Sequence, residues 1–216
     1  MAIAQTATAS QGFDNSDPIT MAFDCAGGDL LVLGIYEILE QRVGGAPTYN
    51  GVAMTDSGQG IVEGASRSIV EMWFVVNPAA GSNTISIPNT SDTNINLAVS
   101  AWSGVDTADP LDTSESDFSA SGNTASVTLT TAAANELIID AMEVGEGTIP
   151  SANSHTLIFS ISTGAQCTNA QYTLDDGSGG ITLDWTLGQA GEDWAMIVAA
   201  FNPSGVTPSR RVFIIS

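Results

Sequence analysis

The chain of 216 residues contains no lysine and only four arginines, Arg42, Arg67, Arg210 and Arg211, against 24 acidic residues. Its formal net charge is −20 at pH 7. Binding to nucleic acid depends on basic side chains that neutralise phosphates, so this composition excludes a nucleic-acid-binding function. An acidic surface also favours solubility in salt, because salt screens repulsion beyond about 10 Å.

Long apolar runs are also lacking. The longest ones lie near Leu30–Ile35 and Trp194–Phe201, and both are far shorter than the roughly 20 residues that a membrane-spanning helix requires. The segment Met1–Thr6 has no basic region followed by an apolar run, so we expect no secretory signal. We therefore expect a protein that has no membrane partner.

Cysteine and histidine are too scarce for most metal and nucleophile chemistry. Cys25 and Cys167 have no second cysteine or histidine at zinc-binding spacing, and we expect buried thiols rather than a disulfide. His155 is the single histidine and follows a loop-like sequence. Since no G-x-S-x-G motif accompanies it, we expect a loop histidine rather than a catalytic triad.

What the chain does contain is a series of short apolar or alternating segments between turn sequences, which is typical of β-strands. The 22 glycines and the turns at 26–29, 77–81, 175–177 and 202–205 divide these segments. This spacing favours one all-β domain over residues 1–204, an antiparallel β-sandwich of jelly-roll type, followed by a C-terminal extended arm over residues 205–216. The expected strands are 3–10, 19–23, 30–37, 48–54, 68–76, 83–87, 96–103, 124–130, 136–143, 156–162, 167–174, 181–186 and 194–201.

Two features of these strands leave alternatives open. Leu30–Val43 contains strong helix formers, but Gly34 interrupts it and β-branched residues cluster at its start, so we predict a strand that ends in a short turn. In addition, residues 28–37 resemble 135–143, and residues 97–104 resemble 196–203. This is either a chance similarity of strands or a duplication, in which two four-strand sets would face each other in one jelly roll.

Carboxylates offer candidate ligand and catalytic groups. Asp106, Asp109 and Asp112 supply three carboxylates in seven residues, which makes calcium the candidate small ligand. The spacing matches no EF-hand, however, and solvated turn aspartates are the default interpretation. We expect no obligatory cofactor.

Glycosidases use a pair of carboxylates across a cleft. Four glutamates in or near the expected strands could form such a pair, but outward-facing side chains on half-exposed sheets explain them more simply. They are Glu37, Glu40, Glu71 and Glu143. We therefore expect that the protein is not an enzyme.

Tryptophans decide whether a sugar could stack on the surface. Trp73, Trp102 and Trp194 lie in apolar sequences typical of a core. Trp185 alternates with residues that leave its face undetermined, which makes it the candidate glycan-binding residue.

The arm combines two of the four arginines with the apolar sequence Val212, Phe213, Ile214 and Ile215. An apolar segment behind a Pro/Gly linker is expected to add to the edge of a sheet, where Arg210 and Arg211 would meet an acidic surface. The alternatives are exchange between subunits, docking on another protein, or a strand that completes the chain's own sandwich.

The sequence Trp73-Phe-Val-Val-Asn-Pro78, the segment Gly81–Ile87 and the sequence Ala98-Val-Ser-Ala-Trp-Ser-Gly-Val-Asp106 followed by Pro110-Leu111 resemble jelly-roll sandwich domains of tailed-phage virion proteins and bacterial surface proteins. The resemblance covers residues 20 to 204 and carries no catalytic residue.

The lack of a signal favours the phage members of this family, which assemble in the host cytoplasm. The resemblance then implies a capsid decoration, or cement, protein that is located in the virion, binds the major capsid protein or other virion subunits, and forms a homo-oligomer. The alternatives are a receptor- or glycan-binding module of a tail fibre or baseplate, which predicts an exposed tryptophan, and a glycan-active enzyme.

Overall fold

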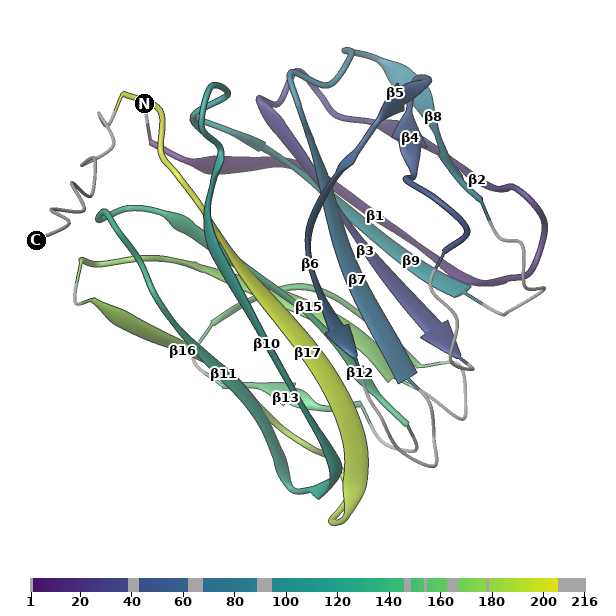
Figure 1. Cartoon of the computed structure of the whole chain (residues 1–216), viewed down its shortest axis with the longest axis vertical. Helices are drawn as coiled ribbons and strands as arrows, with labels where there is room; N and C mark the ends of the chain where they lie inside the picture. The colour runs from purple at the N-terminus through teal and green to yellow at the C-terminus, as the bar shows by residue number, and fades with distance from the viewer. Residues whose placement is uncertain are drawn as a thin grey trace, which may run out of the picture.

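The computed structural model describes residues 2–38, 43–61, 68–88, 95–145, 149–153, 155–162, 167–177 and 179–205 (Figure 1). Within these ranges the chain forms seventeen strands and no helix, and every recorded strand pair is antiparallel. The expected all-β antiparallel sandwich is therefore confirmed.

The strands are β1 (Ala4–Asp14), β2 (Ile19–Asp24), β3 (Leu30–Ile38), β4 (Thr48–Tyr49), β5 (Val52–Ala53), β6 (Thr55–Ile61), β7 (Ser68–Val76), β8 (Ser82–Ile87), β9 (Ile95–Ser103), β10 (Leu111–Gly122), β11 (Thr124–Thr130), β12 (Leu137–Val144), β13 (Ser151–Ala152), β14 (Thr156–Ser162), β15 (Cys167–Leu174), β16 (Gly180–Thr186) and β17 (Glu192–Phe201).

These strands form four sheets stacked in four layers (Figure 1). The outer N-terminal sheet has the order β2-β8-β4-β5 and covers the inner N-terminal sheet, β1-β9-β3-β7-β6. The inner C-terminal sheet, β10-β17-β12-β15-β14, is covered in turn by the outer C-terminal sheet, β11-β16-β13. Three sets of buried apolar side chains fill the three spaces between the layers.

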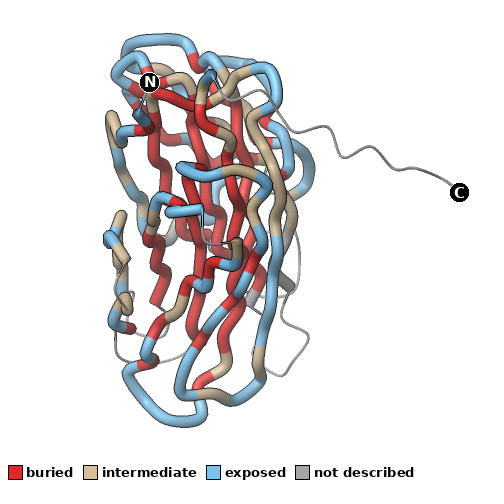
Figure 2. Tube along the Cα trace, turned by 90° about the vertical axis from the view of Figure 1, so that its left-hand side faces the viewer, coloured by how far each residue is buried: buried red, intermediate tan, exposed pale blue. Residues whose placement is uncertain are grey.

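The sequence patterns of the strands follow from these layers. The outer strands β2 and β11 alternate strictly between exposed and buried residues, because one face of each meets water. The inner strands β12 and β17 have no exposed residue, because both of their faces are covered. They appear in the sequence as mostly apolar runs, which Asp140 and Glu143 interrupt in β12. In Figure 2 the buried segments accordingly run through the middle of the molecule, and the exposed ones concentrate in the turns at its two ends.

The two halves of the chain have the same topology. We call β1–β9 repeat one and β10–β17 repeat two. In the inner sheet of repeat one, β1 pairs with β9, β9 with β3, and β3 with β7. In the inner sheet of repeat two, the equivalent pairs are β10 with β17, β17 with β12, and β12 with β15. The similar sequences 28–37 and 135–143 lie at β3 and β12, and 97–104 and 196–203 lie at β9 and β17. The similar sequences therefore lie at equivalent positions of two halves that share one topology.

The expected arrangement of the repeats was wrong. Each repeat does not contribute one half of a single sandwich; it forms two sheets and a core of its own, and the two sandwiches then stack. The cause is that the inner strands are apolar on both faces, so each inner sheet needs one cover from its own repeat and a second cover from the other repeat.

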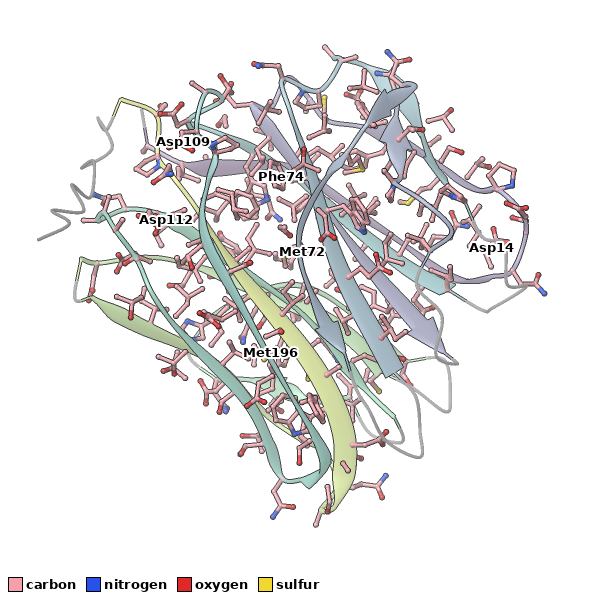
Figure 3. All side chains as sticks on the ribbon, in the orientation of Figure 1. Asp14, Met72, Phe74, Asp109, Asp112 and Met196 are labelled. Carbon is pink, nitrogen blue, oxygen red and sulfur yellow. The ribbon has the colours of Figure 1, made fainter. Side chains whose placement is uncertain are left out.

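The two inner sheets pack through exchanged aromatic pairs. Phe74 of β7 meets Phe201 of β17 with ring centroids 5.5 Å apart, and Trp102 of β9 meets Tyr172 of β15 at 4.7 Å. The strand registers place Phe74 and Tyr172 at equivalent positions of their repeats, and Trp102 and Phe201 likewise. The contact is thus isologous, as in a two-fold symmetric dimer, although both partners belong to one chain. Met72 and Phe74 are seen on this inner face in Figure 3.

Two long strands, β6 and β10, were not expected from the sequence. β6 reads TDSGQGI and β10 reads LDTSESDFSASG. Both are edge strands with polar, small or acidic residues, and β10 has no fully buried residue. Strand prediction depends on apolar alternation, which an exposed edge strand does not need. The expected strand 48–54 is instead two short strands, because Asn50 and Gly51 adopt positive φ values of 50° and 75° in a tight turn.

Replacing Phe201 with alanine is expected to lower the free energy of unfolding by about 3–5 kcal/mol, because the ring is fully buried between the inner sheets. Phe118→Ala is the matched control, since Phe118 is 44 % exposed on β10. Urea unfolding followed by tryptophan fluorescence measures both. Equal losses for the two variants would contradict the view that the inner sheets are stabilised by these rings.

Candidate functional site

Positive charge is absent from the part of the chain that the structure describes, because all four arginines lie outside those ranges and the chain has no lysine. Carboxylates are nevertheless buried in it, among them Glu71, Glu136, Asp140 and Glu143. Burial disfavours the charged form of a carboxyl group, so a buried carboxyl group needs partners that replace its hydration, or it takes up a proton.

Each repeat has a carboxylate that accepts a hydrogen bond from a tryptophan indole inside its core. In repeat one the Nε1 of Trp73 donates to Oε2 of Glu71 at 2.8 Å. In repeat two the Nε1 of Trp185 donates to Oδ2 of Asp140 at 2.8 Å, and the backbone N–H of Gln171 donates to Oδ1 at 2.8 Å. Burial raises the pKa of Asp140 to about 7, although both hydrogen bonds oppose the shift.

Tyr36 of repeat one contacts residues of repeat two. Its hydroxyl donates to the carbonyl oxygen of Asn169 at 3.2 Å, and its ring meets Phe159 edge-on at 5.9 Å. Burial, together with the charges of Asp140 and Glu143, raises the pKa of Tyr36 well above its usual value. The hydroxyl therefore remains a neutral hydrogen-bond donor.

A cavity between the inner sheets lies beside these residues. Its volume is about 10 Å³, which is at the lower limit for one water molecule and far below the ~300 Å³ of a typical ligand pocket. Small residues of sheets from both repeats line it, with Tyr36, Ile158 and Phe159 at its margin. We interpret it as incomplete packing of the inner interface.

The expectation that Trp185 could present an exposed ring to a sugar is wrong. Trp185 is 0 % exposed and lies in the core between β16 and the inner C-terminal sheet, where Asp140 accepts its indole N–H. The residues of β16 do alternate between the two faces of the strand, and Trp185 lies on the buried face. Trp73, Trp102 and Trp194 are buried as expected.

Of the three aspartates that we considered for calcium, Asp106 and Asp109 lie in the loop before β10 and Asp112 lies at the start of that strand. Asp109 and Asp112 are at one end of the molecule, remote from Asp14 (Figure 3). Oδ1 of Asp106 accepts the backbone N–H of Ala108, and Oδ2 of Asp112 accepts that of Ala132, so both shape turns. Among the described residues no three His, Cys, Asp or Glu side chains converge as metal ligands.

The remaining expectations are placed as follows. His155 is half-buried and its Nε2 lies 3.1 Å from the carbonyl oxygen of Thr182. Cys25 and Cys167 are buried and form no disulfide. Glu40 lies outside the described residues, as does the whole partner-binding set Arg210, Arg211, Val212, Phe213, Ile214 and Ile215. No helix in the described ranges is long and apolar enough to cross a membrane.

The most distinctive surface is the flank where β1 meets β14. On the opposite flank β6 lies along β10 so closely that a Cβ on Gly58 would be 2.8 Å from Oγ of Ser114. On this flank β1 and β14 touch over only a short length. The edge of β1 that faces away from β9 pairs with no other described strand, and we call this edge together with Leu157–Phe159 of β14 the β1/β14 flank.

This flank differs from its counterpart in charge and polarity. Residues Ala4–Phe13 of β1 include no charged side chain, whereas the equivalent strand β10 carries Asp112, Glu115 and Asp117. Leu157 of β14 is 51 % exposed. A long, uncharged edge strand beside exposed apolar residues is the arrangement that pairs with another chain. No sequence pattern indicates this site, because the site depends on which strands become the edges of a sheet.

Stability is expected to fall as pH rises from about 4 to about 7. In that window the folded chain retains the proton on Asp140 that the unfolded chain releases, and three pKa units correspond to about 4 kcal/mol. Asp140→Asn should flatten this slope, while Asp117→Asn, an exposed carboxyl on β10, should leave it unchanged. The residual slope would come from Glu136, whose pKa burial also raises to about 7. Denaturant unfolding at a series of pH values measures it, and an unchanged slope in Asp140→Asn would contradict the assignment.

Among the described residues, then, no group of three His, Cys, Asp or Glu side chains is placed to hold a metal ion, and β1 is an edge strand of its sheet. Comparison of the chain with protein-family models, with curated proteins and with solved structures finds no match.

Proposed function

We propose that this chain is a non-enzymatic structural protein that acts through protein–protein contacts. The observation that carries the proposal is the β1/β14 flank, where residues Ala4–Phe13 of the edge strand β1 are uncharged on a molecule with a net charge of −20. Backbone groups on such an edge pair with a partner strand, and the surrounding negative charge restricts the partner to one with a matching strand or basic groups.

We further propose that each repeat is a jelly roll. In repeat one, β1, β3, β7 and β9 lie in the inner sheet and β2, β4, β5 and β8 in the outer one, so the chain crosses repeatedly between two sheets. The order β1-β9-β3-β7 facing β2-β8-β4-β5 is that of two interlocked Greek keys. Repeat two has the same order, with β13 alone in place of the pair β4 and β5.

The biological setting that fits these features is a virion, in which the chain would act as a capsid decoration protein bound to the major capsid protein or other virion subunits. This proposal combines the sequence resemblance to phage jelly-roll proteins with the edge available for assembly. The glycan-binding alternative has lost its aromatic platform, since Trp185 is buried.

Purified, fluorescently labelled chain is expected to bind saturably to viral particles whose genome encodes this sequence, with a fixed number of copies per particle. Co-sedimentation of the labelled chain with stripped particles measures this binding, and an unrelated protein of similar negative charge serves as the control. Absence of the chain from mature particles, together with no rebinding, would contradict the virion role.

A further inference from the structure

The two flanks of the inner interface are equivalent in topology but are not closed to the same extent. On one flank β6 packs closely along β10. On the other flank β1 and β14 touch over only a short length, so that this flank is partly open. The cavity between the inner sheets lies toward this open flank, since Ile158 and Phe159 of β14 line it together with residues of β3 and β9. The open flank is therefore incompletely packed as well as unpaired.

The half-buried Ala7 and Ala9 of β1 point into the core between the N-terminal sheets. Beside them, β2 is the edge strand of the outer sheet on this side and touches β1. A strand added next to β1 would therefore lie under the edge of β2 on one face and beside β14 on the other. Apolar side chains on both of its faces would be covered.

We propose that the β1/β14 flank binds the arm segment Ser209–Ser216 of a second copy of this chain as an added β-strand. The inference rests on the proposed function in that it takes the arm as a protein-binding element. Val212–Ile215 supply four consecutive apolar residues, which suits a strand covered on both faces. Arg210 and Arg211 carry half of the positive charge of the chain and would lie against a molecule whose net charge is −20.

The geometry favours a second copy over the same molecule. The backbone N–H of Ser204 donates to the carbonyl oxygen of Gly104, and Ala4 pairs with Ser103, so the arm begins beside the start of β1. From there it could follow its own β1 only in the parallel direction. Every ladder in the described ranges is antiparallel, and antiparallel pairing is the more stable per residue. Reciprocal exchange between two copies closes the assembly.

The strand β10 supplies a matched control position. Ser10 on β1 pairs with Ala98, and Ser116 on β10 pairs with Ile197 at the equivalent register of repeat two. Both serines are exposed. Lysine at an edge position blocks strand addition, so Ser10→Lys and Ser116→Lys introduce the same change on the proposed edge and on its counterpart.

Light scattering combined with size exclusion tests the inference at about 0.15 M salt, where repulsion is screened beyond about 8 Å. The intact chain and Ser116→Lys are expected to have twice the 22.2 kDa mass of one chain, while Ser10→Lys and a chain that ends at Pro208 are expected to be monomers. Thermal unfolding checks that each variant is folded. A monomeric intact chain, or a dimer that survives either Ser10→Lys or removal of the arm, would overturn the inference.

A second measurement does not depend on assembly. A labelled peptide of Ser209–Ser216 is expected to bind the chain that ends at Pro208 saturably in fluorescence anisotropy, and to bind its Ser10→Lys form at least tenfold more weakly. Equal affinities for the two forms would overturn the inference. A monomer that still binds viral particles would overturn this inference alone, whereas a dimer that binds no particles would count only against the virion role.

Discussion

The face-to-face packing of the two inner sheets is the contact on which the rest of the structure depends. Their strands are apolar on both faces, so neither repeat can bury its inner sheet without the other. The exchanged pairs Phe74 with Phe201 and Trp102 with Tyr172 make this packing self-complementary. A single chain thereby contains the kind of contact that elsewhere joins two identical subunits.

The acidic composition creates a second constraint, because no cation is present in the described ranges to neutralise a buried carboxylate. Indole and backbone N–H groups donate to the buried carboxylate of Asp140. Such donors only partly offset the loss of hydration, which is why the pKa of Asp140 stays raised.

The edge strands β1 and β10 occupy equivalent positions in the two repeats but lie in different surroundings. β10 carries three acidic residues and is covered by β6, and both features protect an edge from unwanted pairing. β1 has neither protection along Ala4–Phe13. β1 and β10 share topology and register, so the difference between them lies in the residues of β1 and in the open flank. This difference is the main reason that we propose contact with a partner on that side of the molecule.

The sequence by itself determined the all-β class, most of the strands and the burial of three tryptophans, because apolar periodicity is a local property of each strand. Only the tertiary structure decided that each repeat forms its own sandwich, that Trp185 faces inward onto Asp140, and that β6 and β10 are strands at all. An edge strand needs few apolar residues, and the face of an alternating strand depends on which sheet covers it. Both are properties of the assembled layers, so no local pattern could predict them.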